Sequence, residues 1–124
     1  MPARIVLVHS DSDFNIAATV ALTVAGYDVA SFSDPVMALD FLDTARTVEV
    51  LITRMRFGPD KPNGFVLART ARRMRPDIRV LFTAQAEFAQ FAAGLGDFIA
   101  APITPTDLVE GVRRLLAVSD FRPC

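Results

Sequence analysis

Residues 48–54 read Val-Glu-Val-Leu-Ile-Thr-Arg, a short apolar segment that ends in a charge and is followed by a loop rich in Pro and Gly. Its β-branched residues and the apolar run at 50–52 predict a strand buried on both faces, as in the interior of a parallel sheet. Open α/β sheets bind ligands at the carboxyl ends of their strands. The residue at which this strand stops, Arg54, therefore falls where a functional site is expected.

The part of the chain before this segment alternates twice between predicted strand and helix. Strands are expected at Ile5–Val8 and Asp28–Phe32, and helices from about Asp13 to Ala25 and from Pro35 to about Ala45. Gly26 follows the first helix in the position that commonly ends one. The residues of the first helix expected to face the core are Phe14, Ala17, Ala18, Ala21 and Val24.

The alternation continues after the opening segment. A loop is expected from Arg54 to Asn63, whose side chain can cap the helix that follows. The later elements are a helix at Gly64–Arg75, a strand at Arg79–Phe82, a helix at about Glu87–Leu95, a strand at Asp97–Ala100 and a helix opened by Thr104–Asp107, a pattern close to a capping box. The core positions expected in the last two helices are Phe88, Phe91, Ala92 and Leu95, then Leu108, Val112 and Leu115.

Five strands alternating with five helices through short connections predict a parallel sheet with right-handed crossovers. The predicted fold is α/β: one doubly wound five-stranded sheet of flavodoxin-like order 2-1-3-4-5, a three-layer (βα)₅ sandwich. We expect residues 1–124 to form one domain, with a core at about 4–118 and a tail at 119–124. This topology gathers six residues at the carboxyl edge of the sheet: His9, Ser10, Asp11, Arg54, Thr83 and Ala101.

Composition narrows the classes of function. The chain has 124 residues, is 52% hydrophobic, and has no apolar run near the roughly 18 residues of a membrane span. A net charge of −1 argues against nucleic acid as the partner. The start, Met1–Arg4, leads directly into a strand, so no signal peptide is expected. The single cysteine, Cys124, allows no disulfide framework, which fits a cytoplasmic location.

Five short segments in register over about residues 4–118 give the chain a family resemblance. They are Arg4–Val8 before a polar turn, Ala25–Val29, Asn63–Gly64 at the start of the third helix, Val80–Ala84 and Phe98–Pro102. Together they resemble the receiver domain of bacterial two-component response regulators. The resemblance implies a phosphorelay signalling module in which an aspartate is phosphorylated with the help of Mg²⁺.

That chemistry needs a nucleophilic aspartate, acidic ligands for a hard cation, a hydroxyl for the phosphoryl oxygens and a lysine for the developing charge. The resemblance places the aspartate at Arg54, the acidic pair at His9–Ser10 and the lysine at Ala101. The family pattern is kept only at two positions, the hydroxyl residue Thr83 and the proline Pro102.

These departures act together. Arginine cannot accept a phosphoryl group as a carboxylate does, and its permanent positive charge repels Mg²⁺ from the same pocket. One carboxylate at Asp11 beside that cation is a poor magnesium site. The chain is therefore interpreted as a degenerate, pseudo-receiver type without metal, cofactor or enzymatic activity. It is expected to act by contact with a histidine kinase, a phosphotransfer protein, an output protein or a second copy of itself.

Three environments are open to the Arg54 side chain. It can form an ion pair with Asp11, because an isolated buried charge is costly. It can also extend into solvent. A third arrangement joins Arg54 to the hydroxyls of Thr83 and Ser10 as an anion site, since arginine with hydroxyls suits phosphate.

The first helix has no charged residue from Asn15 to Ala25, although a helix outside a doubly wound sheet usually has a charged outer face. Ile16, Val20 and Thr23, with Thr19, share a second face. This face is either an interface with a partner or second subunit, on the side where the resemblance places phosphotransfer partners, or a mildly apolar exposed surface.

Three further features have a functional and a structural interpretation. The lone histidine, His9, is interpreted as structural, and Phe98 stands at the position that the resemblance gives to the switch aromatic. A basic stretch is interpreted as a solvated helix face, with an acidic partner as the alternative; it contains Arg54, Arg56, Lys61, Arg69, Arg72, Arg73 and Arg75.

Two other functions compete with the pseudo-receiver. One is a receiver with displaced phosphorylation chemistry at Asp11 or Asp60. The other is a flavodoxin-like protein that binds a small anion, nucleotide or flavin. No Gly-rich phosphate loop follows the first strand, and no nucleophile–base pair is evident, which argues against this last class.

Overall fold

The computed structural model describes residues 3–45, 47–57, 60–92 and 94–120. One parallel sheet has the order β2-β1-β3-β4-β5, which confirms the predicted flavodoxin-like topology. Its strands are β1 (Arg4–Val8), β2 (Asp28–Phe32), β3 (Val50–Arg54), β4 (Arg79–Ala84) and β5 (Asp97–Ala100). The predicted and observed strands agree to within two residues at each end.

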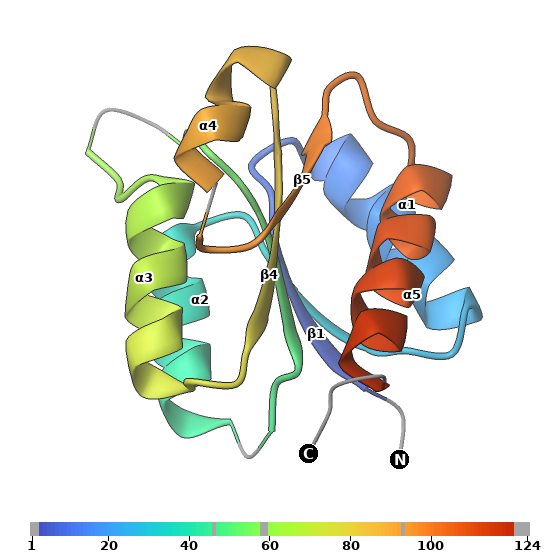
Figure 1. Cartoon of the computed structure of the whole chain (residues 1–124), viewed down its shortest axis with the longest axis horizontal. Helices are drawn as coiled ribbons and strands as arrows, with labels where there is room; N and C mark the ends of the chain where they lie inside the picture. The colour runs from blue at the N-terminus through green and yellow to red at the C-terminus, as the bar shows by residue number, and fades with distance from the viewer. Residues whose placement is uncertain (1–2, 46, 58–59, 93, 121–124) are drawn as a thin grey trace.

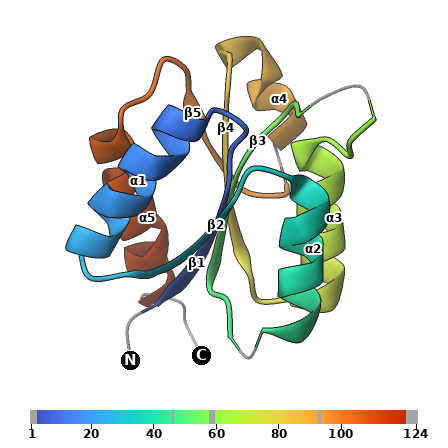
Figure 2. The ribbon, with the colours of Figure 1, turned by 180° about the vertical axis from the view of Figure 1, so that it is seen from behind.

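Helices cover both faces of the sheet (Figures 1 and 2). They are α1 (Ser12–Val24), α2 (Pro35–Thr44), α3 (Gly64–Met74), a short 3₁₀ helix (Ala86–Phe88) that leads into α4 (Ala89–Ala92), and α5 (Pro105–Asp120). Helices α1 and α5 lie on one face, and α2, α3 and α4 lie on the other. The result is the expected three-layer sandwich.

The central strand β3 supplies both layers of the core. Val50 and Ile52 belong to the apolar cluster under α1 and α5, whereas Leu51 belongs to the cluster under α2 and α3. All three side chains are at most 1% exposed. Because alternate residues of a strand point to opposite faces, a strand buried on both sides needs an apolar residue at each position. This explains the continuous apolar run.

Local capping interactions fix where the helices start. Asp34 accepts a 2.9 Å hydrogen bond from the Val36 amide at the start of α2, and Asn63 accepts one from Val66 at the start of α3. At α5 the Thr104 amide donates to the Asp107 carboxylate and the Asp107 amide donates to the Thr104 hydroxyl. This reciprocal pair is the capping box that the sequence predicted.

The core-facing side of α1 differs from the prediction. The buried residues are Asn15, Ala18 and Leu22, whereas Val24 is 82% exposed and Ala17 is also exposed. The reason is that the Asn15 side-chain amide donates 3.0 Å hydrogen bonds to the carbonyls of His9 and Phe32. A polar residue thus takes a core position because it satisfies two backbone acceptors after β1 and β2.

The fourth helix is also shorter than predicted. Helical structure covers 86–92 rather than 87–95, and Phe91, expected in the core, is 50% exposed. Gly94 has φ +83°, a left-handed conformation that an α-helix does not contain. Gly96 then packs so closely on β4 that an added Cβ would lie 2.4 Å from the Val80 carbonyl oxygen. The chain must turn before β5, and this ends the helix early.

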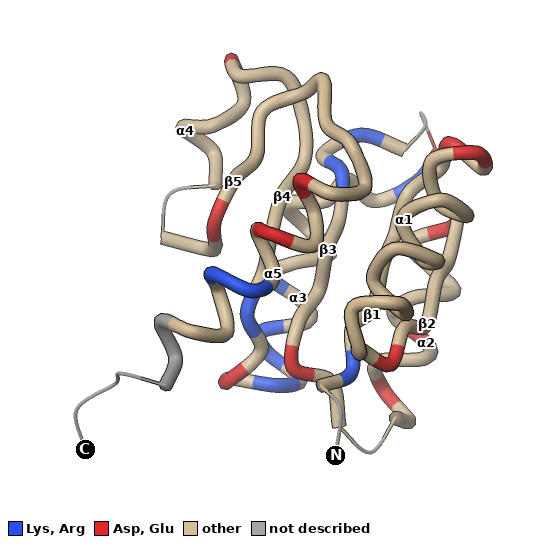
Figure 3. The backbone as a smooth tube through the Cα atoms, turned by 90° about the vertical axis from the view of Figure 1, so that its right-hand side faces the viewer, with Lys and Arg blue, Asp and Glu red and all other residues tan. Residues whose placement is uncertain are grey.

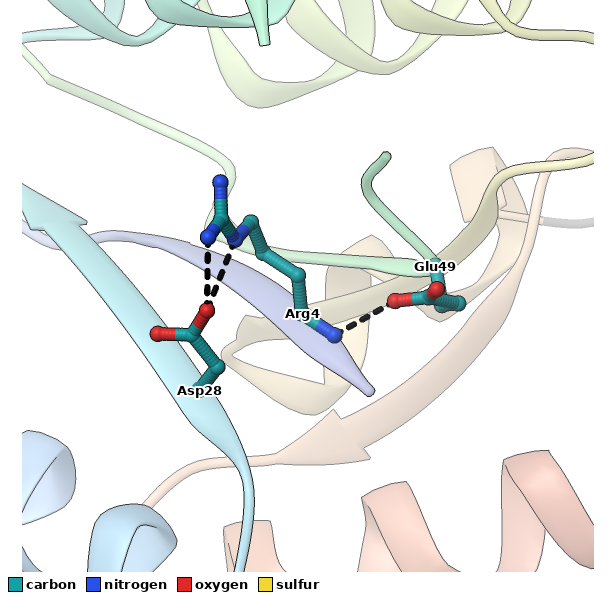
Figure 4. A network of polar contacts seen from close by, with 3 residues as sticks. All are labelled: Arg4, Asp28 and Glu49. Carbon is teal, nitrogen blue, oxygen red and sulfur yellow. Dashed lines mark hydrogen bonds and ion pairs between the residues drawn. The ribbon is translucent and has the colours of Figure 1, made fainter. Parts of the chain in front are cut away.

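The amino ends of three strands are joined by charged side chains (Figure 4). Arg4 donates two hydrogen bonds to Asp28, at 2.9 and 2.7 Å, and its backbone amide donates to the Glu49 carboxylate. This network holds β1, β2 and the residue before β3 at the edge opposite the candidate site. Helix α5 continues to Asp120, past the expected start of the tail at 119, and residues 121–124 lie outside the described residues.

None of the helices among the described residues has the length and apolar character needed to cross a bilayer.

Candidate functional site at the carboxyl edge of the sheet

Arg54 and Thr83 are neighbours across two strands. Arg54 is the last residue of β3, and Thr83 is its register partner in β4. Register partners in a parallel sheet extend their side chains to the same face, so both side chains leave the sheet on one side. The structure therefore brings together two of the six residues that the sequence placed at this edge.

The guanidinium of Arg54 is bound to a hydroxyl and not to a carboxylate. Its Nη1 lies 2.8 Å from Oγ of Ser10, in the turn after β1. Of the environments that the sequence left open for Arg54, the ion pair with Asp11 is not formed, because no ion pair of Arg54 is found among the described residues. Asp11 instead caps α1 by accepting hydrogen bonds from the amides of Asp13 and Phe14, at 3.1 and 3.3 Å. The helix amides therefore compete successfully for the one carboxylate near Arg54.

Both the backbone and the ring of His9 are held by contacts within the chain. Its backbone amide continues the β1–β2 ladder by donating to the Phe32 carbonyl at 3.0 Å, and its ring centroid lies 4.6 Å from that of Phe14. The pKa of His9 is lowered to about 4, chiefly by burial and then by the positive charge of Arg54, with the charge of Asp11 partly opposing both effects. Its Nδ1 accepts a hydrogen bond from the Asp11 amide at 3.2 Å. The ring is therefore neutral at neutral pH.

Thr83 has a buried hydroxyl that lacks a hydrogen-bond partner. The residue is 3% exposed, and its Oγ1 is the one side-chain oxygen or nitrogen in this condition within the described residues. A buried hydroxyl without a partner costs free energy, about 1–3 kcal/mol in proteins. Such a group calls for a partner that the chain itself does not provide.

The position expected for a lysine is occupied by a methyl side chain. Ala101 follows β5 and is exposed, and its backbone amide donates to the Ala84 carbonyl at 2.7 Å. Pro102, also exposed, follows in a cis peptide bond. Neither side chain brings charge to the edge of the sheet, so Arg54 is the cation at this point.

The donor set does not fit Mg²⁺. Hard divalent cations take oxygen ligands, chiefly carboxylates. The side chains here are an imidazole, two hydroxyls, an arginine and one carboxylate that caps a helix. In the described ranges, His, Cys, Asp and Glu side chains form no group of three or more that could hold a metal ion. We therefore derive no step through magnesium.

Several cations of the basic stretch are bound to carbonyls or to a carboxylate of the chain itself. Arg72 donates to the carbonyls of Ile78 and Leu95, at 3.2 and 2.7 Å, and Arg75 donates to that of Leu42 at 2.9 Å. Lys61 forms a 2.7 Å ion pair with Asp34. These cations join loops to helices, so the stretch is only partly the solvated face that was expected. Arg56, which the sequence did not single out from the stretch, lies beside Arg54.

A hollow of about 250 Å³ lies at the ends of β3 and β4. Its lining includes Arg54, Arg56, Thr83, Gln85 and Phe88. The guanidinium carbon of Arg56 is 5.4 Å from the centroid of the Phe88 ring, within the range of a cation–π contact. Sequence reasoning did not assign Arg56, Gln85 or Phe88 to the site. The available signal was the pair of arginines two residues apart directly after a buried strand.

The second face of α1 is exposed. Ile16 and Val20 are 65% and 57% exposed, and Thr23 is exposed with its hydroxyl bonded to the Thr19 carbonyl. Figure 3 shows α1 without charged residues after its first turn. Phe98, in β5, is half-buried and packs against the core under α2 and α3.

Comparisons with known proteins give a fold but no sequence family. No family model matches the chain, and no curated protein matches it. A receiver domain protein from Methanospirillum hungatei JF-1, described as CheY-like, superposes with TM-score 0.84 at 22% identity, over 97% of this chain and 98% of that one.

Two bacterial structures agree with it. A response regulator receiver protein from Sinorhizobium medicae WSM419 gives TM-score 0.82 at 24% identity, covering 94% of this chain and 95% of its own. The chemotaxis protein CheY4 of Vibrio cholerae gives 0.81 at 21% identity, covering 93% and 99%. At these identities the likeness is one of fold, and the chain has the receiver-domain fold of two-component response regulators.

Proposed function

We propose that this chain is a signalling module of the receiver type that is not phosphorylated at the usual position and acts through protein contacts. The observation that carries the proposal is Arg54 at the end of β3, hydrogen bonded to Ser10. The resemblance implies an acceptor aspartate at the position of Arg54 and a metal-binding acid at the position of Ser10. The arginine thus occupies the position of the acceptor and binds the residue in place of the metal ligand.

Electrostatics support this proposal. Phosphorylation of a carboxylate in this family requires Mg²⁺ and a lysine to offset the charge of the phosphoryl group. Here a permanent cation stands at the acceptor position, and Ala101 replaces the lysine. Displaced chemistry at Asp11 has little support, because its carboxylate accepts two helix amides. Asp60 is exposed in the loop after β3, and no ion pair found among the described residues joins it to the site.

The contact surface that we propose is the second face of α1, formed by Ile16, Val20 and Thr23. Exposed aliphatic side chains on an uncharged helix are a common feature of protein interfaces. The resemblance suggests a histidine kinase, phosphotransfer protein, output protein or second copy of the chain as the partner. A role for Phe98 in shaping the α4–β5–α5 surface is part of the same proposal.

Intact-mass spectrometry tests the proposal. The chain is incubated with Mg²⁺ and an acyl phosphate as phosphodonor, beside a receiver that has the complete set of acids and lysine. The expected result is an adduct on the control alone. A stoichiometric phosphoryl adduct on this chain would overturn the proposal, and peptide mapping would then identify the residue that replaced the missing aspartate.

A further inference from the structure

The hollow at the ends of β3 and β4, here called the arginine hollow and lined by Arg54, Arg56, Thr83, Gln85 and Phe88, has the chemistry of an anion site. Two arginines, Arg54 and Arg56, line one space of about 250 Å³. Neither forms an ion pair with an acid among the described residues. The charge of the hollow is therefore not balanced by the chain itself.

Thr83 supplies a second and independent observation. Thr83 lines this hollow, and its buried hydroxyl has no hydrogen-bond partner among the described residues. A hydroxyl can donate to an oxyanion, and the side chains of its register partner Arg54 and of Arg56 can bind the other oxygens of the same anion. The hydroxyl has little accessible surface, so a neighbouring side chain must shift to admit the anion. The long and flexible arginine chains are suited to that movement.

Two surrounding features preserve the positive potential of the arginine hollow. The His9 ring is neutral, and the Asp11 carboxylate accepts hydrogen bonds from the first amides of α1 and forms no ion pair with Arg54 among the described residues. The lowered pKa of His9, to about 4, results in part from the positive charge of Arg54. The field of this arginine therefore reaches other groups at the edge of the sheet, and the charge of Asp11 offsets it only in part.

An apolar hollow adjoins the charged one. It has a volume of about 270 Å³, and its lining includes Phe65 and Phe91. Three residues line both hollows: Met55, Arg56 and Phe88. Aromatic walls beside two guanidinium groups match a ligand that has an oxyanion at one end and a planar apolar group at the other.

We propose that the arginine hollow binds a phosphate-type oxyanion without forming a covalent bond, either as free phosphate or as an ester whose aromatic group enters the apolar hollow. Arg54, Arg56 and the Thr83 hydroxyl bind the anion. The inference rests on the proposed function, because the arginine hollow is free to bind an anion only if the chain is not phosphorylated there. It adds a ligand class to the module, so that the site would sense a phosphate compound by binding it.

The test is an NMR titration of the isotope-labelled full chain in metal-free buffer at constant ionic strength. The probes are inorganic phosphate and phenyl phosphate, with chloride as the reference anion. We expect saturable shifts at residues around Arg54 and Thr83 with both probes. Tighter binding of phenyl phosphate identifies an ester as the ligand, and equal binding identifies free phosphate. No saturable shift with either probe overturns the proposal.

Three variants make the result specific. Arg54→Gln and Thr83→Val should each weaken phosphate binding about tenfold or more, since each removes a hydrogen bond to a charged group. Arg114→Gln makes the same change of charge on the exposed side of α5 and should leave the affinity within about twofold. Equal losses in all three variants, or none in Arg54→Gln, would contradict a built site.

The NMR titration and the intact-mass measurement test the two proposals separately. Inorganic phosphate is not a phosphodonor, and the titration contains no metal, so it cannot produce the adduct that the mass measurement seeks. Phosphate binding with no covalent adduct supports both claims. A covalent adduct formed from the acyl phosphate overturns the proposed function alone. The absence of inorganic phosphate binding in the titration overturns the anion site alone.

Discussion

Arg54 donates a 2.8 Å hydrogen bond from Nη1 to Oγ of Ser10, which joins the end of β3 to the turn after β1. The contact crosses 44 residues of sequence and lies at the carboxyl edge of the sheet. An uncharged partner leaves the full charge of the arginine available to other groups. The first two predictions concern the groups that this charge and its surroundings affect.

Removal of the Arg54 charge should raise the pKa of His9. In the native chain this pKa is about 4, chiefly through burial and then through Arg54. The Arg54→Gln variant removes only the second cause, so the value should rise but stay below the ordinary 6.5. Proton NMR of the single histidine as a function of pH measures it directly. An unchanged value would show that Arg54 does not act on His9.

The same pKa shift determines how stability depends on pH. The unfolded chain protonates His9 near pH 6.5, whereas the folded chain resists protonation down to about pH 4. The contribution of His9 to the free energy of unfolding is complete above pH 6.5 and is lost as the pH falls from 6.5 to 4. Urea unfolding of the chain and of a His9→Gln variant across this range isolates the effect, which should be absent in the variant.

Thr83→Val should raise the free energy of unfolding in the absence of phosphate by about 1 kcal/mol, because it removes a buried hydroxyl that has no partner. Thr53→Val is the matched control. Thr53 is also buried, but its hydroxyl donates to the Arg54 carbonyl at 2.9 Å. That variant should lose about 0.5–1.5 kcal/mol. Urea denaturation compares them, and equal losses would show that the Thr83 hydroxyl has a partner.

Val20→Glu should leave the fold intact, because Val20 is 57% exposed, and change the free energy of unfolding by no more than about 0.5 kcal/mol. It should also abolish a dimer or partner contact on this face of α1, because a buried unpaired charge is costly. Leu22→Ala, at a fully buried position two residues further along the same helix, should cost about 2–5 kcal/mol.

Sedimentation equilibrium measures the oligomeric state of Val20→Glu and Leu22→Ala, and urea denaturation measures their free energy of unfolding. An oligomeric state that is the same in Val20→Glu and the unaltered chain would remove the self-association form of the interface proposal. A loss of stability as large as that of Leu22→Ala would show that the face packs within the chain.

Asn15→Ala tests the corrected orientation of α1. Two backbone carbonyls, of His9 and Phe32, would lose their hydrogen bonds at a position only 9% exposed. The expected cost is about 1–3 kcal/mol. Ala17→Ser, at an exposed position of the same helix, is the control and should change stability by less than about 0.5 kcal/mol. Similar small effects in both variants would contradict the observed orientation.

The strand order could be predicted from the sequence because the central strands are continuous apolar runs and most helices, α1, α2, α3 and α5, begin at a capping side chain. The orientation of α1 could not, because helical periodicity assigns polar residues to the outside, whereas Asn15 lies inside and satisfies two carbonyls. The shortened α4 was missed because its aromatic spacing suggests a longer helix. Gly94, which adopts a left-handed conformation, ends it.

The candidate site could be located but not assembled from sequence. Topology placed Arg54, Ser10 and Thr83 at one edge, since that edge is defined by where the strands stop. The partner of Arg54 depended on a local competition: the amides of α1 bind the Asp11 carboxylate, and only Ser10 is left. Gln85 and Phe88 line the hollow because the chain turns sharply after β4, and the sequence pattern does not predict that turn.

The most direct test compares phosphoryl uptake by the chain with uptake by a variant that restores the chemistry implied by the resemblance, His9→Asp, Ser10→Asp, Arg54→Asp and Ala101→Lys together. Both are incubated with Mg²⁺ and an acyl phosphate and read by intact mass. The account predicts a magnesium-dependent adduct on the restored variant and none on the unaltered chain. A stoichiometric adduct on the unaltered chain would contradict the claim that Arg54 and its neighbours have removed the phosphorylation switch.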